Sequence, residues 1–295
     1  MDLIRGKREL QRRADAERAG GHRIALVPTM GALHAGHLSL VELARSRTDR
    51  VWVSIFVNPT QFKQNSDFEG YPRDLEADIE TCRANGVDLV YAPEVADLYP
   101  QDDQTWVDVE ELSRPLCGAR RPGHFRGVAT VVAKLLLAAK PHVAIFGEKD
   151  FQQLAIIRRM VGDLGIDVEI LGGPILREPD GLALSSRNVH LGPAAREQAV
   201  ALVEALDAVE RLVASGERSR DTLVAALRAR LGEAPLAVID YAELRDPDTL
   251  ELAPETLSGP VLLALAVNFQ RDPSGAGAPV RLIDNRVVVA VPREP

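Results

Sequence analysis

The residues most suited to chemistry lie in one short segment, Pro28–His37, which reads PTMGALHAGH. It follows an apolar run typical of a strand and opens a helical pattern, so His34 and His37 should share one side of a first helical turn. The unpaired N–H groups and positive dipole end of such a turn favour an anion, and Gly36 lets a flat base approach the backbone. Two histidines could simply cap a helix, but their place after the first strand of an α/β sheet favours nucleotide binding.

A second segment, Phe146–Gln153 with the sequence FGEKDFQQ, also joins a predicted strand to a helix. Lys149 could neutralise phosphate, and Asp150 could hold Mg²⁺ directly or through water. Both would lie at the carboxyl ends of the strands, where open α/β sheets bind ligands. Taken alone, however, the segment is better explained as a helix start with a capping acid and a solvated lysine.

A third segment, Leu184–Asn188 with the sequence LSSRN, follows an Asp180-Gly181 turn. Two hydroxyls and a guanidinium in succession suit a triphosphate. A polar hinge loop explains the same residues equally well.

Two glutamines, Gln61 and Gln153, follow predicted strands and could converge on a neutral polar ligand. A carboxamide both donates to and accepts from hydroxyls, as a polyol-like substrate requires, although a surface glutamine is the usual alternative. The basic loop Arg120–Gly127 either binds an anion or contacts another part of the chain, and the sequence leaves both readings open.

The elements that position these residues alternate between short apolar strands and amphipathic helices. The predicted strands are Ile24–Val27, which Pro28 should stop, Val51–Val57, Leu89–Ala92, Val143–Phe146 and Val168–Leu171. The predicted helices include one with Leu75, Ile79 and Cys82 on a common face, Val128–Ala139, and one after Asp150. This alternation predicts a doubly wound, Rossmann-like parallel sheet.

The pattern changes after about Pro174. Two helices, Ala194–Ala214 and Thr222–Leu231, are followed by strands at Val238–Leu244, Val261–Val267 and Val280–Ile283, with the Asp272–Ala278 loop joining the last two as a hairpin. We therefore expect an α/β domain over residues 1–176 and a smaller α+β domain over residues 177–295.

Composition narrows the class of protein. The chain has 295 residues and a formal net charge of −8, which argues against dedicated nucleic-acid binding. Cys82 and Cys117 have no CxxC spacing, so a disulfide framework and a structural zinc site are not expected. Met1–Gly21 lacks the features of a targeting peptide and no apolar run approaches a membrane span. These observations predict a cytoplasmic protein without nucleic-acid or membrane partners.

Taken together, the segments resemble the pantothenate synthetase (pantoate–β-alanine ligase) family. The resemblance covers nearly the whole chain, and its ordered segments are PTMGALHAGH, SIFVNPTQF, YPR at Tyr71–Arg73, RPGHFRGV, FGEKDFQQL, DGLALSSRN and RLIDN. The family belongs to a nucleotidyltransferase superfamily that includes class I aminoacyl-tRNA synthetases, in which HAGH is similar to the HIGH signature and SSRN to the mobile KMSKS loop.

The resemblance implies that ATP and (R)-pantoate form pantoyl adenylate and pyrophosphate, after which β-alanine displaces AMP. Mg²⁺ would accompany ATP, and the family is usually homodimeric. The second domain would carry the SSRN loop and cover the active site. His37 is the family's usual candidate for a proton donor, although we interpret it mainly as a phosphate ligand.

The same resemblance implies particular residues. The catalytic set is His34, His37, Lys149, Ser185, Ser186 and Arg187. The ATP-binding set adds Met30, Gly31, Gly36, Gly147, Glu148, Asp150, Leu176 and Leu184. The set for pantoate and β-alanine is Pro28, Thr29, Met30, Asn58, Gln61 and Gln153. Asp150 is the candidate metal ligand.

Two departures from the family pattern stand out. Leu184 replaces a frequent methionine, which should change only packing beside adenine, and of Glu76, Ala77 and Asp78 only Asp78 is a clear acidic match to a region with outer-sphere Mg²⁺ contacts. The alternative enzyme is an HxGH nucleotidyltransferase that adenylylates another small acceptor, such as nicotinate mononucleotide or pantetheine phosphate. A synthetase for tRNA and an inactive nucleotide-binding regulator fit less well.

Overall fold

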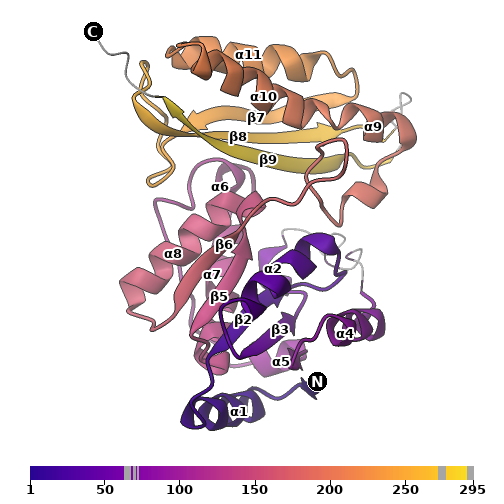
Figure 1. Cartoon of the computed structure of the whole chain (residues 1–295), viewed down its shortest axis with the longest axis vertical. Coiled ribbons are helices and arrows are strands. Elements are labelled where there is room, and N and C mark those ends of the chain that lie inside the picture. Colours follow the sequence, from indigo (N-terminus) through magenta and orange to yellow (C-terminus); the bar gives the residue numbers. More distant parts are fainter. Residues whose placement is uncertain (63–67, 69–70, 72, 272–276, 291–295) are drawn as a thin grey trace. The chain divides into compact units, whose positions relative to one another are not determined.

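The computed structural model describes residues 1–62, 68, 71, 73–271 and 277–290. The chain divides into two compact units, residues 1–174 and 175–295 (Figure 1). Pro72 of the YPR segment and residues 272–276 of the predicted hairpin loop lie outside the described part.

A six-stranded parallel sheet forms the centre of the first unit, in the order β1-β4-β3-β2-β5-β6. Its strands are β1 (Asp2–Ile4), β2 (Ile24–Thr29), β3 (Arg50–Ile55), β4 (Leu89–Tyr91), β5 (Val143–Gly147) and β6 (Glu169–Gly173). The predicted doubly wound sheet is thereby confirmed. The short edge strand β1 was not predicted, because three residues are too few to show a periodic pattern.

Helices cover both faces of this sheet. They are α1 (Lys7–Ala19), α2 (Ala35–Arg45), α4 (Leu75–Ala84), α5 (Val95–Leu98), α6 (Cys117–Arg120), α7 (His124–Ala139) and α8 (Phe151–Leu164), with 3-10 turns η1 (Pro59–Gln61) and η2 (Glu148–Asp150). On the α2 and α4 face, Val41 and Cys82 pack with Val27, Val53 and Ile145 of the strands. Across the sheet, β3 lies on one side of β2, whereas β6 lies on the opposite side of β5. Because both connections are right-handed crossovers, α2 and α8 lie on opposite faces of the sheet.

Pro28 does not stop its strand as predicted, because β2 continues to Thr29 and Pro28 pairs in register with Ser54 of β3. It does stop the ladder on the other side. The Ile24 carbonyl accepts from the N–H of His142, just before β5, and the Thr29 carbonyl accepts from the N–H of Phe56, just after β3. Successive residues of a strand direct their backbone groups to opposite neighbours, so the backbone nitrogen of Pro28 faces β5. Proline has no N–H to donate there, and the β2–β5 pairing ends at Leu26.

The second unit is an antiparallel sheet packed under helices. Strands β7 (Ala237–Arg245), β8 (Gly259–Phe269) and β9 (Val280–Ala290) pair in that order, and α10 (Ala201–Ala214) and α11 (Arg220–Gly232) cover them. Leu206, Leu227 and Leu263 are among the residues of the shared core. The short elements η3 (Asn188–His190) and α9 (Pro193–Gln198) precede α10. This arrangement confirms the predicted α+β class.

Two elements of this unit differ from the sequence prediction. The expected helix Ala194–Ala214 is divided at residues 199–200 into α9 and α10, and the Gln198 side chain accepts from the Leu236 N–H where α9 ends. Strand β9 extends to Ala290, well beyond the predicted Val280–Ile283. The extension contains charged residues, which fit a partly buried strand because they form ion pairs. Asp284, for example, is 2% exposed and bound by Arg177.

Candidate active site

The predicted site segments of the first unit meet where the sheet reverses its strand order. Strands β2 and β5 are parallel neighbours, and the loop before α2 and the turn η2 leave their carboxyl ends. Ligands of open α/β sheets bind in the crevice at such a switch point. Met30–His37 and Gly147–Asp150 are therefore brought together as the sequence analysis expected.

The turn after β2 is held by a buried carboxylate. Gly31 and Ala32 have φ angles of 82° and 51°, which is unfavourable for a non-glycine residue such as Ala32. The Asp78 Oδ2 accepts from the Ala32 N–H at 3.0 Å and its Oδ1 from the Leu33 N–H at 2.8 Å. A Cβ on Gly31 would lie 2.7 Å from that Oδ2, so the position has no room for a side chain. Asp78 thus fixes the turn that leads into the histidines.

His34 and His37 cap the helix and still present donors to a ligand. His34 is the N-cap of α2, one residue before the first turn in which it was expected. The Gly36 N–H donates to the His34 Nδ1 at 3.1 Å, and the His34 N–H donates to the His37 Nδ1 at 3.3 Å. A neutral imidazole whose Nδ1 accepts carries its proton on Nε2. The two rings, whose centroids are 4.1 Å apart, therefore offer a pair of Nε2–H donors.

Both histidines are held neutral. Burial, then the charges of His34 and Lys149, lower the pKa of His37 from about 6.5 to about 3. Burial and Lys149 also lower the pKa of His34. At neutral pH, then, the site offers hydrogen-bond donors from two neutral rings close to the positive charge of Lys149.

The low pKa of His37 predicts a pH dependence of stability. The unfolded chain protonates this ring near pH 6.5 whereas the folded chain does not until about pH 3. The stabilisation is complete above the unfolded value and is lost as pH falls from there towards the folded value. Between pH 6.5 and 5, His37→Gln should lose about 1.6 kcal/mol less unfolding free energy than the wild type. Urea unfolding of both proteins at the two pH values tests this, and parallel losses would contradict it.

Gln61 is oriented by a buried network beside Met30. The Asn58 Nδ2 donates to the Gln61 Oε1 at 3.1 Å, and the Gln61 Nε2 lies 3.0 Å from the Met30 Sδ. The Asn58 Oδ1 accepts from the hydroxyls of Thr60 and Tyr99, each at 2.9 Å. Asn58, expected among the substrate-binding residues, is 1% exposed. Its contacts make it a support for Gln61.

The basic loop left open by the sequence supports the same glutamine. The Gly127 carbonyl accepts from the Asn58 Nδ2 at 3.1 Å, and the His124 Nδ1 lies 2.9 Å from the Gln61 carbonyl oxygen. A Cβ on Gly127 would lie 2.5 Å from the Thr60 carbonyl oxygen. The start of α7 therefore packs directly on the Asn58–Gln61 turn. Of the two interpretations of the Arg120–Gly127 loop, contact with another part of the chain describes His124 and Gly127.

The remaining predicted residues of the first unit differ in their surroundings. The Thr29 hydroxyl donates to the Ser54 carbonyl and accepts from the Gly31 N–H, so it stabilises the turn. Gln153 is half-buried and Asp150 is exposed. Asp150 begins α8 without a side-chain cap, unlike the capping acid of the alternative interpretation. Gln152 was not predicted, yet its buried amide holds the Leu112–Cys117 segment through three hydrogen bonds.

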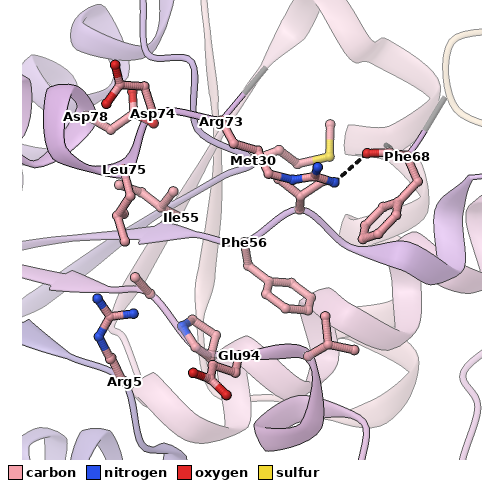
Figure 2. Close-up of a pocket in the computed structure, with 14 residues that line it drawn as sticks. Arg5, Met30, Ile55, Phe56, Phe68, Arg73, Asp74, Leu75, Asp78 and Glu94 are labelled. Atoms are coloured by element: carbon pink, nitrogen blue, oxygen red, sulfur yellow. Dashed lines mark hydrogen bonds between the residues drawn. The ribbon is translucent and has the colours of Figure 1, made fainter. Parts of the chain in front are cut away.

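A cavity of about 300 Å³ lies beside this site. Figure 2 shows Met30 and Asp78 on its wall, above Phe56, with Arg5 and Glu94 at its other end. Its floor is formed mainly by apolar side chains at the carboxyl ends of β3 and β4. The turn that carries the histidines therefore borders an accessible volume as well as the switch point.

The predicted triphosphate residues lie in the second unit. Leu176 and Leu184 are joined by a backbone hydrogen bond of 2.9 Å, and Ser185, Ser186 and Arg187 follow directly. The Ser185 Oγ accepts from the Arg187 N–H at 3.2 Å, and the Arg187 side chain is exposed.

No resident metal centre is apparent in the described ranges. Among those residues, no three His, Cys, Asp or Glu side chains are grouped in a way that could hold a metal ion. Asp78 is the acidic residue that matches the family's region of outer-sphere Mg²⁺ contacts. In this structure both of its carboxylate oxygens accept hydrogen bonds from backbone N–H groups. Nor is any helix in this part of the chain both long and apolar enough to cross a membrane.

A doubly wound sheet with helix-start donors and a lysine at its switch point defines a nucleotide-binding α/β protein of the Rossmann-like class. Comparison with known proteins identifies the family. The model of the pantoate-beta-alanine ligase family matches residues 2–287, and the chain belongs to that family.

Individual relatives agree over their full length. Pantothenate synthetase of Geobacter sulfurreducens is 52% identical over 98% of this chain and 99% of its own. A crystal structure of pantothenate synthetase from Thermus thermophilus has a TM-score of 0.88 and 43% identity, covering 99% of this chain and 100% of that one. The Francisella tularensis pantoate-beta-alanine ligase, complexed with beta-gamma ATP and beta-alanine, has a TM-score of 0.75 and 32% identity over 97% of both chains.

Proposed function

We propose that this chain joins (R)-pantoate to β-alanine at the expense of ATP, through a pantoyl adenylate. The observation that carries this proposal is the pair of neutral imidazoles at the start of α2, next to Lys149, in a chain that belongs to the ligase family over residues 2–287. Neutral donors and one cation suit a phosphate whose charge is redistributed during reaction.

The chemistry takes two steps. A pantoate carboxylate oxygen bonds to the α-phosphorus of ATP, and the bond from that phosphorus to the β-phosphate oxygen breaks to release pyrophosphate. The β-alanine amine then attacks the acyl carbon, loses a proton and displaces AMP. No covalent enzyme intermediate is needed, because the adenylate stores the activation. Holding adenylate and amine together makes aminolysis competitive with attack by water.

The charged groups have separate tasks in the first step. The Nε2–H donors of His34 and His37 bind oxygens of the α-phosphate as charge builds there, and Lys149 neutralises the phosphates. With a pKa of about 3 in the free protein, His37 serves as a hydrogen-bond donor and is a poor acid at pH 7. Gly36 and Gly147 leave backbone room for the nucleotide, whereas Gly31 allows the close approach of Asp78 that holds the turn.

The organic substrate lies against the glutamines. Gln61 and Gln153 bind the hydroxyls and carboxylate of pantoate, with Pro28, Thr29 and Met30 forming the adjoining wall. Because Asn58 donates to the Gln61 oxygen, the Gln61 NH₂ group is the end that faces pantoate. Gln61 also borders the β-alanine pocket.

The second unit contributes to phosphate binding. Ser185, Ser186 and Arg187 bind the triphosphate and Leu184 packs beside adenine, so that residues 177–295 act as a domain covering the active site. Charge-assisted hydrogen bonds from a guanidinium suit the departing pyrophosphate.

The carboxylates present fit a magnesium ion that arrives with ATP. Mg²⁺ is commonly bound by one or two carboxylates together with substrate phosphates, and Asp150, exposed beside Lys149, is the candidate carboxylate. When bound, the ion neutralises phosphate charge and helps pyrophosphate to leave. We further propose a cytoplasmic homodimer with small molecules, and no nucleic acid, as its substrates.

An assay of both products tests the activity. With ATP, Mg²⁺ and pantoate, AMP should form only when β-alanine is added, accompanied by pyrophosphate. If pyrophosphate is released but the formation of AMP does not depend on β-alanine, the protein is instead a nucleotidyltransferase with another acceptor. No product in either channel would overturn the enzymatic assignment.

A further inference from the structure

A β-hairpin leads into the Ser185–Arg187 segment. Its two arms meet at the Arg177–Ala183 bridge, and the Glu178 N–H donates to the Leu182 carbonyl at 2.8 Å. The turn between the arms contains Gly181 at a φ of 92°, where L-residues with side chains are strained. The direction in which the hairpin points therefore sets where the Ser185–Arg187 segment starts.

The hairpin is fastened to a strand residue about a hundred positions further along the chain. The Arg177 guanidinium donates to both carboxylate oxygens of Asp284 on β9, at 2.7 and 2.9 Å. The same guanidinium donates to the Gly181 carbonyl at 3.0 Å, so one side chain links the first arm, the turn and β9. A bidentate pair of this kind fixes orientation as well as distance.

The buried state of the carboxylate makes this link specific. The Asp284 side chain is fully buried and its Oδ1 also accepts from the Asn285 N–H at 2.8 Å. A buried carboxylate is unfavourable without such partners. Asp284 lies in the RLIDN segment, which the proposed chemistry leaves without a task.

The far side of the segment is also tied to the hairpin. The Asn188 Nδ2 donates to the Glu178 Oε1 at 3.1 Å and to the Ala183 carbonyl at 3.2 Å. The hairpin is therefore connected to both ends of Ser185–Arg187, through the chain at Leu184 and through the side chain of Asn188.

We infer that Asp284 is a positioning residue for the reaction: through Arg177 it orients the hairpin and so places Ser185–Arg187 against the ATP phosphates. The inference rests on the proposed function of that segment. Asp284 itself does not touch the nucleotide, and its effect should fall on ATP and not on pantoate.

A matched pair separates positioning from mere stability. Arg281, on the same strand β9, donates to the Asp240 Oδ2 of β7 through Nε at 3.0 Å and Nη2 at 2.9 Å. This pair is also mostly buried, and it joins two strands of the sheet. Asp240→Asn therefore removes a comparable ion pair from the same unit without loosening the hairpin's anchor.

The experiment compares Asp284→Asn with Asp240→Asn in pyrophosphate release, varying ATP and pantoate separately. Hydrogen exchange of the amides of residues 182–188 is followed in parallel. Asp284→Asn should raise the KM for ATP about five- to tenfold, leave the KM for pantoate within about twofold, and speed exchange in the segment. Asp240→Asn should do none of these. Equal effects of the two variants, or equal losses for both substrates, would overturn the inference.

Two further variants keep the result interpretable. Arg177→Lys retains the charge but loses the bidentate geometry, so it should repeat the ATP effect even where Asp284→Asn folds poorly. Arg187→Ala tests the proposed function of the segment itself. Unchanged ATP kinetics in Arg187→Ala would refute that function, whereas an impaired Arg187→Ala together with an Asp284→Asn that behaves like Asp240→Asn would refute only the positioning role.

Discussion

Replacing His37 with alanine is expected to slow formation of pantoyl adenylate by roughly 10²- to 10³-fold, the usual effect of removing one preorganised donor from a developing charge. The lost group is the Nε2–H, because the Nδ1 is occupied by the His34 N–H. His37 is half-buried and lies close enough to Lys149 to feel its charge, so alanine would remove the donor from a partly enclosed site. Single-turnover measurement of pyrophosphate release isolates this step.

Two further variants control that measurement. His37→Gln restores an N–H donor at the end of a comparable side chain and should recover part of the lost rate. His22→Gln alters a histidine before the amino end of β2, at the opposite edge of the sheet, and should leave the rate unchanged. Wild-type turnover in His37→Ala, with the circular dichroism spectrum retained, would remove His37 from the mechanism.

Replacing Gln61 with alanine is expected to weaken pantoate binding about 50-fold and ATP binding less than about threefold. Hydrogen bonds to a charged partner contribute about 1.5–3 kcal/mol, and each 1.4 kcal/mol is a factor of ten. The selectivity follows from orientation. Asn58 donates to the Gln61 oxygen and one N–H of the Gln61 NH₂ group points to the Met30 Sδ, so the second N–H serves the hydroxyls and carboxylate of pantoate and no phosphate. Gln153→Ala should show the same preference.

Isothermal titration with each substrate separately measures this selectivity. Gln101→Ala, at an exposed position, is the control and should bind both substrates as the wild type does. Equal losses for ATP and pantoate in Gln61→Ala would show that the glutamine supports the site as a whole and does not select the acid.

The first unit from Ile24 onwards could largely be predicted from sequence because its buried strands are continuous apolar runs and several of its helices have a clear apolar face, whereas β1 and α1 were not predicted. Strand β9 could not be delimited, since Arg281, Asp284 and Arg286 look like a loop until their partners are known. Those partners lie far away in sequence: Asp240, Arg177 and Asp207. A periodic pattern reports burial only for residues that are apolar.

The site was predictable to a similar depth. The turn Met30–His37 after β2 and the segment Gly147–Asp150 after β5 could be identified because each follows a strand and combines glycine with ionisable residues. The supports were not: Asp78 lies 45 residues beyond the Leu33 N–H that it accepts from, and nothing in a helix start distinguishes it from an ordinary acidic residue. Asn58 stays a predicted substrate-binding residue, but its near-complete burial and its support of Gln61 could not be recognised from sequence alone.

Pro28 has a consequence for the width of the crevice. Neighbouring paired strands stand about 4.8 Å apart, too close for a substrate between them, and β2 and β5 hold that spacing only as far as Leu26. With an N–H at position 28, pairing would be free to advance towards Thr29 and Gly147 and to draw the two carboxyl ends together. Pro28 removes that donor, so one hydrogen bond that would extend the β2–β5 pairing towards the Met30–His37 turn cannot form.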